Sequence, residues 1–155
     1  MKGPLDDGDV AQFRHDGFVV KRRWFDGEEM EALARYARED PELVSHHLPV
    51  KDTSGRESRL TLWNHPGDDL YGMFSRCRRV VEGAEQLLGD EVYHYHAKMM
   101  LKEPRVGGAW EWHQDYGYWY QNGCLYPDML SVMIAVDRAD GENGCLEVLR
   151  GSHHL

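Results

Sequence analysis

His113 and Asp115 are the residues of this chain whose types and spacing are best suited to chemistry. On an extended strand the side chains of residues i and i+2 point to the same face, so this imidazole and this carboxylate would lie side by side. One His and one carboxylate are two of the three ligands of the facial triad that holds catalytic non-haem Fe(II). Chance alone produces about 0.8 His-x-Asp triplets in a chain of this composition. The triplet is therefore informative only with support from the surrounding sequence.

Two neighbouring segments could form a pocket around this pair. A period-2 alternation over residues 91–102 predicts a strand with His94, His96 and Lys98 on one face. That face is either exposed to water or lines a polar cavity, where His96 and Lys98 would meet a charged ligand. Residues 116–120 contain four aromatic side chains. We expect them to form a loop that either packs on its own strand or, as we favour, lines an apolar pocket.

The elements that would position these residues are helices in the first half and strands in the second. Apolar spacing and capping residues predict helices from a cap at Asp7 or Asp9 to Gly17, from Asp26 to about Glu39, and from Leu70 to Leu88. Short strands are expected at residues 18–20, 59–63, 110–115, 129–136 and 146–149. This order predicts the α+β class, with helices that back a sheet or barrel.

Composition excludes several functional classes. The chain has 155 residues, 41% of them hydrophobic, which fits a single globular domain. Its net charge of −9 argues against nucleic acid as a partner, because phosphate binding needs a basic surface. We expect no membrane partner, since no segment resembles a leader or a membrane span. The three cysteines lack metal-binding spacing and suit a reducing compartment, so a cytoplasmic location is expected.

Four segments give the triplet a context. They are residues 13–20 (FRHDGFVV), 96–104 (HAKMMLKEP), 112–115 (WHQD) and 142–153 (ENGCLEVLRGSH). In content and order they resemble the phytanoyl-CoA dioxygenase family of Fe(II)- and 2-oxoglutarate-dependent oxygenases. The resemblance implies a double-stranded β-helix of the jelly-roll or cupin-like kind. It also implies O2 and a small organic substrate as reaction partners.

The same resemblance assigns roles to individual residues. It implies that His113 and Asp115 are the iron ligands and act in catalysis. It implies a 2-oxoglutarate pocket contacted by Lys98, Gln114, Ser131 and Met133. The alternation of the sequence independently places Lys98 on the less apolar face of its strand, and Ser131 with Met133 on the less apolar face of residues 129–136.

The chain departs from the family pattern at its end. The family's second iron-binding His and an Arg that pairs with 2-oxoglutarate lie beyond the segment that matches residues 142–153. We therefore expect residues 1–155 to be the N-terminal part of one phytanoyl-CoA-dioxygenase-like domain, with an incomplete barrel and two iron ligands. A replacement ligand from His94 or His96 is the less favoured reading.

Two other functions fit the same residues. One is a cupin-like metal enzyme that does not use 2-oxoglutarate, because His-x-Asp strands recur in such barrels. The other is a non-catalytic remnant that binds a protein partner through an unpaired sheet edge. The aromatic residues after Asp115 permit an apolar or ring-bearing substrate.

Overall fold

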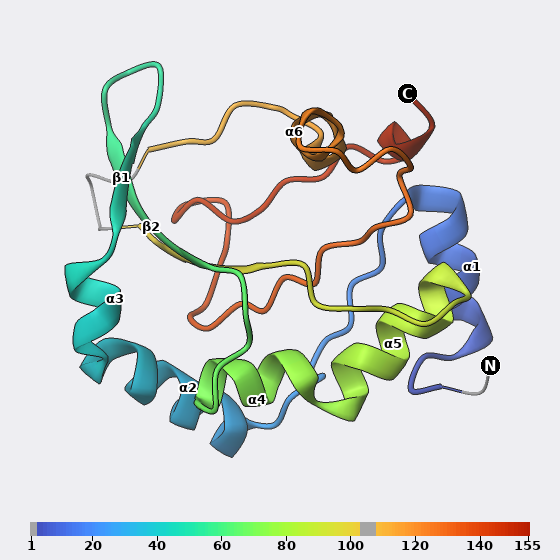
Figure 1. The fold of residues 1–155 in the computed structure, drawn as a ribbon, viewed down its shortest axis with the longest axis horizontal. Helices are drawn as coiled ribbons and strands as arrows, with labels where there is room; N and C mark the ends of the chain where they lie inside the picture. Colours follow the sequence, from blue (N-terminus) through green and yellow to red (C-terminus); the bar gives the residue numbers. More distant parts are fainter. Residues whose placement is uncertain (1–2, 103–107) are drawn as a thin grey trace.

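The computed structural model describes residues 3–102 and 108–155, apart from the side chain of Val44. The elements are, in order, α1 (Asp7–Asp16), α2 (Gly27–Glu39), α3 (Pro41–Ser45), β1 (Leu48–Lys51), β2 (Glu57–Trp63), α4 (Leu70–Arg76), α5 (Arg78–Leu88), β3 (Ala97–Leu101), α6 (Asp115–Gln121) and the 3-10 turn η1 (Ser152–His154). Figure 1 shows α2, α4 and α5 following one another along the lower edge, with α6 and the C-terminal turn at the upper edge. The α+β class is confirmed. None of the described helices is long and apolar enough to cross a membrane.

Capping residues define the first two helices. Asp6, rather than Asp7 or Asp9, caps α1, and Asp9 completes a capping box at the third helical position. Asp26 and Glu29 form the capping box predicted for α2. Each box satisfies backbone N–H groups that the first turn of a helix leaves without an internal partner.

The single helix predicted from Leu70 to Leu88 is two helices. The apolar stripe is continuous in sequence, but Cys77 has an extended backbone with a ψ of 145° and separates α4 from α5. The break lets the two helices pack on different neighbours: α4 contacts α2, whereas α5 contacts α1. A local apolar pattern cannot predict this change of direction, because the packing partners are distant in sequence.

The sheet has three antiparallel strands in the order β1-β2-β3. Leu60 of β2 pairs with Leu48 of β1 on one side and with Met100 of β3 on the other. The strand expected at 59–63 is confirmed within β2. The strand expected at 91–102 is shorter, because only Ala97–Leu101 pairs with β2.

The core lies between α2, α4 and the sheet. Its buried members are Leu33, Leu43, Tyr71 and Phe74. The Phe74 ring is 4.8 Å from that of Phe25 by centroid, a distance typical of favourable aromatic pairs. Partly buried hydrophobic side chains pack against this cluster, including Ile134 and Val136 from the second half of the chain.

Four of the predicted strands are not strands in the structure. Residues 18–20, 110–115, 129–136 and 146–149 form no β-ladder among the described residues. Alternation determines which side chains share a face, but a strand also needs a neighbour that supplies backbone hydrogen bonds. The described residues thus contain a small antiparallel sheet, and the double-stranded β-helix stays a prediction.

Candidate metal centre

His113 and Asp115 lie side by side, as their spacing predicts. His113 Nε2 is 3.3 Å from Asp115 Oδ1. Between them Gln114 has an extended backbone, with φ of −109° and ψ of 125°, and α6 begins at Asp115. An extended backbone is enough for the i, i+2 placement, even without a strand ladder. The two side chains are 31% and 38% exposed, so a dissolved ion can reach them.

A backbone carbonyl fixes the tautomer of His113. Its Nδ1 is 2.6 Å from the carbonyl oxygen of Glu111. A carbonyl oxygen can only accept, so Nδ1 carries the hydrogen and donates it. In the neutral ring, Nε2 then holds the lone pair that faces Asp115. A cation between Nε2 and the carboxylate oxygen would interact favourably with both atoms, whether it is the second proton of an imidazolium or a metal ion. Histidine residues that bind metals commonly donate their other ring N–H to a backbone carbonyl in this way.

Further side chains surround the pair. Ser131 Oγ donates a hydrogen bond of 3.4 Å to Asp115 Oδ2, the carboxylate oxygen that does not face His113. The His113 ring is 5.9 Å by centroid from the rings of both Trp110 and Tyr118. The donor set of one imidazole nitrogen and one carboxylate oxygen therefore fits two positions of a divalent metal ion.

A pocket of about 310 Å³ lies beside Trp119 of α6. Its lining residues are Leu62, Asn64, Tyr95, His96 and Trp119. The Trp119 ring is 4.7 Å from His96 and 5.2 Å from Tyr95 by centroid. Trp119 lies about one helical turn after Asp115, so α6 connects the pocket to the His113–Asp115 pair.

The charge state of His96 follows from its surroundings. Burial lowers the pKa of the ring, the positive charge of Lys98 lowers it further, and the carboxylate of Asp115 acts in the opposite direction. His96 is therefore neutral at neutral pH. Its Nδ1 is buried without a hydrogen-bond partner among the described residues. A bound molecule could supply that partner.

The remaining predicted site residues are placed differently. Lys98 is on β3, and its Nζ is 5.8 Å from the centroid of the Trp110 ring. Gln114 Nε2 donates a hydrogen bond of 2.7 Å to the carbonyl oxygen of Ser152. Met133 is 60% exposed. The structure thus brings together His113, Asp115 and Ser131, and the cofactor contacts of Lys98, Gln114 and Met133 stay predictions.

The sequence matches the family model described as phytanoyl-CoA dioxygenase over residues 13–155. The chain belongs to the phytanoyl-CoA dioxygenase family. This confirms the resemblance that its four segments suggested. Enzymes of this family are generally dependent on Fe(II) and 2-oxoglutarate.

Curated relatives of this family member are oxygenases. The chain is 41% identical over 91 residues to L-proline trans-4-hydroxylase from Streptomyces griseoviridis. This match covers 58% of this chain and 34% of that protein. It is 28% identical to ectoine dioxygenase from Streptomyces avermitilis, over 97% of this chain and 52% of that protein. It is 27% identical to ectoine dioxygenase from Halomonas elongata, over 99% of this chain and 47% of that protein. The chain thus spans about half the length of the ectoine dioxygenases, and its match with the proline hydroxylase covers about a third of that protein.

A third ligand is not assembled within the described part of this family member. No group of three or more His, Cys, Asp or Glu residues that could hold a metal ion occurs among the residues that the structure describes. Both ring nitrogens of His94 are buried without a described hydrogen-bond partner. A replacement ligand from His94 or His96 stays the less favoured alternative.

Sequence reasoning missed part of the pocket. Tyr95 was expected on the face opposite to His96, but both line the pocket because residues 91–96 lie outside the β-ladder. The expected aromatic loop at residues 116–120 is helical and forms most of α6. Its aromatic content was the usable signal, since Trp119 lines the pocket and Tyr118 contacts His113.

Proposed function

We propose that this chain is the iron-binding part of an Fe(II)- and 2-oxoglutarate-dependent dioxygenase that hydroxylates a small organic substrate. One observation carries the proposal: His113 Nε2 and Asp115 Oδ1 are 3.3 Å apart, and Nδ1 is already bonded to a carbonyl. Membership of the phytanoyl-CoA dioxygenase family supports the choice of metal and cofactor.

His113 and Asp115 would hold the metal through Nε2 and Oδ1. Bound iron supplies the chemistry that couples the oxidative decarboxylation of 2-oxoglutarate by O2, to succinate and CO2, to the conversion of a substrate C–H into C–OH. The carbonyl of Glu111 keeps the Nε2 lone pair free, and Ser131 holds the second carboxylate oxygen. These contacts fix the direction of both donors before any ligand binds.

The cofactor would lie between β3 and residues 129–136. Lys98 offers an ammonium group for a carboxylate of 2-oxoglutarate, and its position over the Trp110 ring brings that charge near the His113 segment. Ser131 lies on the same side, next to Asp115. The family resemblance adds Gln114 and Met133 to these contacts; we retain Met133, whereas the side-chain amide of Gln114 is already bonded to the carbonyl oxygen of Ser152.

The pocket beside α6 would receive the substrate. Tyr95 and Trp119 present aromatic rings, and the neutral His96 adds one polar group. Its volume is at the lower end of the range of small-molecule sites. A compact ring-bearing molecule suits it, and the names of the relatives suggest proline and ectoine as the first compounds to try.

We further propose that a longer protein completes the site. The chain spans about half the length of the ectoine dioxygenases that it matches, and its described residues bring two ligands together. A downstream His would supply the third ligand, and a downstream Arg would bind the far carboxylate of 2-oxoglutarate. For the 155-residue chain alone we expect weak metal binding and no coupled turnover.

Succinate formation tests this function. The full-length protein is incubated with Fe(II), 2-oxoglutarate, O2 and a panel that includes proline and ectoine. We expect succinate and a hydroxylated product, both lost in His113→Ala. Metal-dependent activity that is indifferent to 2-oxoglutarate would instead support a cupin-like enzyme. A metal-free protein without turnover would contradict both enzymatic readings.

A further inference from the structure

Gln114 lies between the two proposed ligands, and its side chain points away from them. Its backbone is extended, so its side chain is opposite to those of its neighbours. Its Nε2 donates a hydrogen bond of 2.7 Å to the carbonyl oxygen of Ser152, which is 38 residues further along the chain. Although Gln114 precedes the first residue of α6, its side chain makes no capping hydrogen bond to that helix. The amide therefore connects the metal segment to the C-terminal turn.

That turn is attached to the last turn of α1. The N–H of Gly151 donates a hydrogen bond of 2.8 Å to the carbonyl oxygen of Asp16. His153 Nε2 donates one of 3.2 Å to the carbonyl oxygen of Arg14. Arg150 Nε lies 3.5 Å from the Asp16 carboxylate. Three residues of the C-terminal segment, Arg150, Gly151 and His153, thus contact one end of α1.

Asp16 is a poor residue for the stability of α1 itself. It is only 7% exposed, and it ends the helix at the negative end of the macrodipole, where a carboxylate is disfavoured. Two side chains stabilise its charge: His15 through a hydrogen bond of 2.7 Å from Nδ1, and Arg150 of the C-terminal segment through an ion pair. The contact with Arg150 therefore serves to attach the turn.

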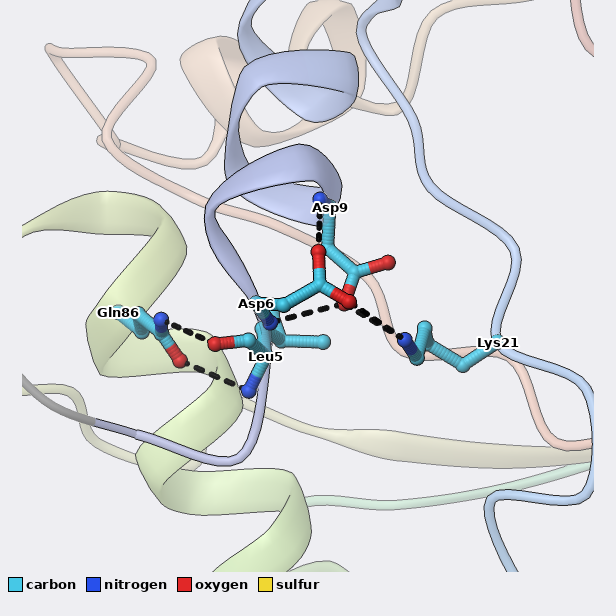
Figure 2. A network of polar contacts seen from close by, with 5 residues as sticks. All are labelled: Leu5, Asp6, Asp9, Lys21 and Gln86. Carbon is cyan, nitrogen blue, oxygen red and sulfur yellow. Dashed lines mark hydrogen bonds and ion pairs between the residues drawn. The ribbon is translucent and has the colours of Figure 1, made fainter.

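The position of α1 is fixed in turn by α5. Figure 2 shows the side-chain amide of Gln86 paired with both backbone groups of Leu5, just before α1. The two hydrogen bonds are 3.0 Å and 2.7 Å long. Lys21 Nζ also donates to Asp9 in the first turn of α1, at 2.6 Å. A continuous set of contacts therefore leads from α5 through α1 and the C-terminal turn to Gln114.

The metal segment needs such a tether. Residues 110–114 belong to no β-ladder within the described residues, so they lack the backbone hydrogen bonds that hold a strand residue in place. The bond between His113 and Glu111 is internal to the segment. A side-chain bond from Thr53 to Glu111 holds its other end. Gln114 lies between the two ligands in the sequence, and its side chain makes a hydrogen bond to a residue that is distant in the sequence.

We propose that Gln114 is a positioning residue: its hydrogen bond to Ser152 fixes residues 113–115 against the C-terminal turn on α1 and so aims His113 and Asp115 at one metal ion. This rests on the proposed function. It differs from the family-based role, in which Gln114 contacts 2-oxoglutarate. In the positioning role, loss of the amide weakens metal binding before any cofactor is added.

Co(II) titration of the 155-residue chain, followed by absorption, tests the proposal. Gln114→Leu removes the donor at similar size, and we expect Co(II) affinity to fall about tenfold with a changed Co(II) spectrum, as for other groups that orient metal ligands. Asp16→Asn, which loses the ion pair with Arg150, should also lower the Co(II) affinity, although Asp16 is not part of the metal site. Because both substitutions act through one set of contacts, the double variant should lose no more Co(II) affinity than Gln114→Leu alone. Gln121→Leu, the same change at an exposed residue of α6, should bind as the wild type does.

The outcomes separate this inference from the proposed function. If His113→Ala binds Co(II) as well as the wild type, the metal site itself is wrong. If His113→Ala loses binding but Gln114→Leu does not, the positioning role is overturned. It is also overturned if Gln114→Leu changes only the 2-oxoglutarate concentration needed to perturb the Co(II) spectrum. Should Gln114→Leu fail to fold by circular dichroism, Asp16→Asn with wild-type Co(II) affinity and spectrum would overturn it.

Discussion

At the residue scale, the direction of the His113 lone pair depends on one carbonyl two residues earlier. The Glu111 oxygen takes the Nδ1 hydrogen and leaves Nε2 facing the Asp115 carboxylate. If Nε2 also carried a hydrogen, the pair would be an ordinary ion pair. A divalent metal ion in the same place carries a higher charge than a proton and would bind the same two atoms.

His96 provides a pH-dependent prediction at this scale. Burial and Lys98 lower the pKa of its ring from the usual value near 6.5. The unfolded chain then binds the proton more readily than the folded one. The contribution of His96 to the free energy of unfolding is therefore fully present above about pH 6.5 and is lost as the pH falls towards the native pKa. A titration of the ring signals by NMR should give a midpoint below 6.5.

Two variants check the causes of this shift. Lys98→Met removes a nearby positive charge and should raise the pKa of His96. Asp115→Asn removes a nearby negative charge and should lower it further. Identical midpoints in both variants and the wild type would show that His96 is not close to the charges of the metal centre.

Local spacing predicted that His113 and Asp115 lie side by side, but it did not predict the residues around them. The i, i+2 rule places His113 and Asp115 on one side and Gln114 on the other, and it depends only on an extended backbone. The partners of these residues, Ser131 and Ser152, are distant in sequence, and no local pattern indicates them. Side-chain direction was thus predictable, whereas the bonding partners were not.

At the scale of elements, the end of α1 combines a helix stop with a docking site. Gly17 has a positive φ of 86° and donates its N–H to the carbonyl oxygen of Phe13. His153 packs so closely on it that an added Cβ would be 2.4 Å from His153 Nδ1. A side chain at this position is therefore opposed by both the backbone conformation and the C-terminal turn.

Gly17→Ala should destabilise the chain more than Gly89→Ala. Gly89 ends α5 with a similar φ of 81°, but an added Cβ there meets open space. We expect Gly89→Ala to lower the free energy of unfolding by about 1–2 kcal/mol through backbone strain. Gly17→Ala should cost about 1 kcal/mol more, because His153 must move. Urea unfolding followed by circular dichroism measures both.

His153→Ala is the matched background for this comparison. Without the imidazole the added Cβ has more room, so Gly17→Ala should then cost about as much as Gly89→Ala. An equal cost of Gly17→Ala with and without His153 would contradict the close packing of the C-terminal turn on α1.

Helix signals were more informative than strand signals. The Asp26 capping box predicted the start of α2, because the cap is a local interaction. The helix α6 was missed, since its Gly and aromatic residues have low helix propensity and its Trp119 is held by distant rings. The alternation over residues 129–136 did predict the packing of Ile134 and Val136 on the core, although no ladder forms there.

At the scale of the whole molecule, the buried core belongs to the first half of the chain. Its cluster of buried residues comes from α2, α3 and α4, and the second half adds only partly buried side chains to it. Large hydrophobic side chains of residues 125–149 remain exposed, among them Leu125, Val132, Leu146 and Leu149. In our proposal the rest of a longer protein would cover them.

Amide hydrogen exchange should reveal this difference between the halves. The N–H groups of β2 and of α5 are in ladders or helical turns, so we expect them to exchange slowest. The amides of residues 129–136 and 146–149, which form no ladder with any described residue, should exchange faster than those of β2 and α5. Slow exchange over residues 129–136 would show that this segment is hydrogen-bonded as a strand.

The role of His113 and Asp115 as metal ligands is tested most directly by metal binding itself. The 155-residue chain is titrated with Co(II) and followed by absorption, beside His113→Ala, Asp115→Asn and the control His65→Ala, which changes an exposed histidine. We predict saturable binding of one ion, weak but measurable, in the wild type and in His65→Ala. Both ligand variants should lose it. Unchanged Co(II) affinity in His113→Ala or Asp115→Asn would contradict the proposed metal centre.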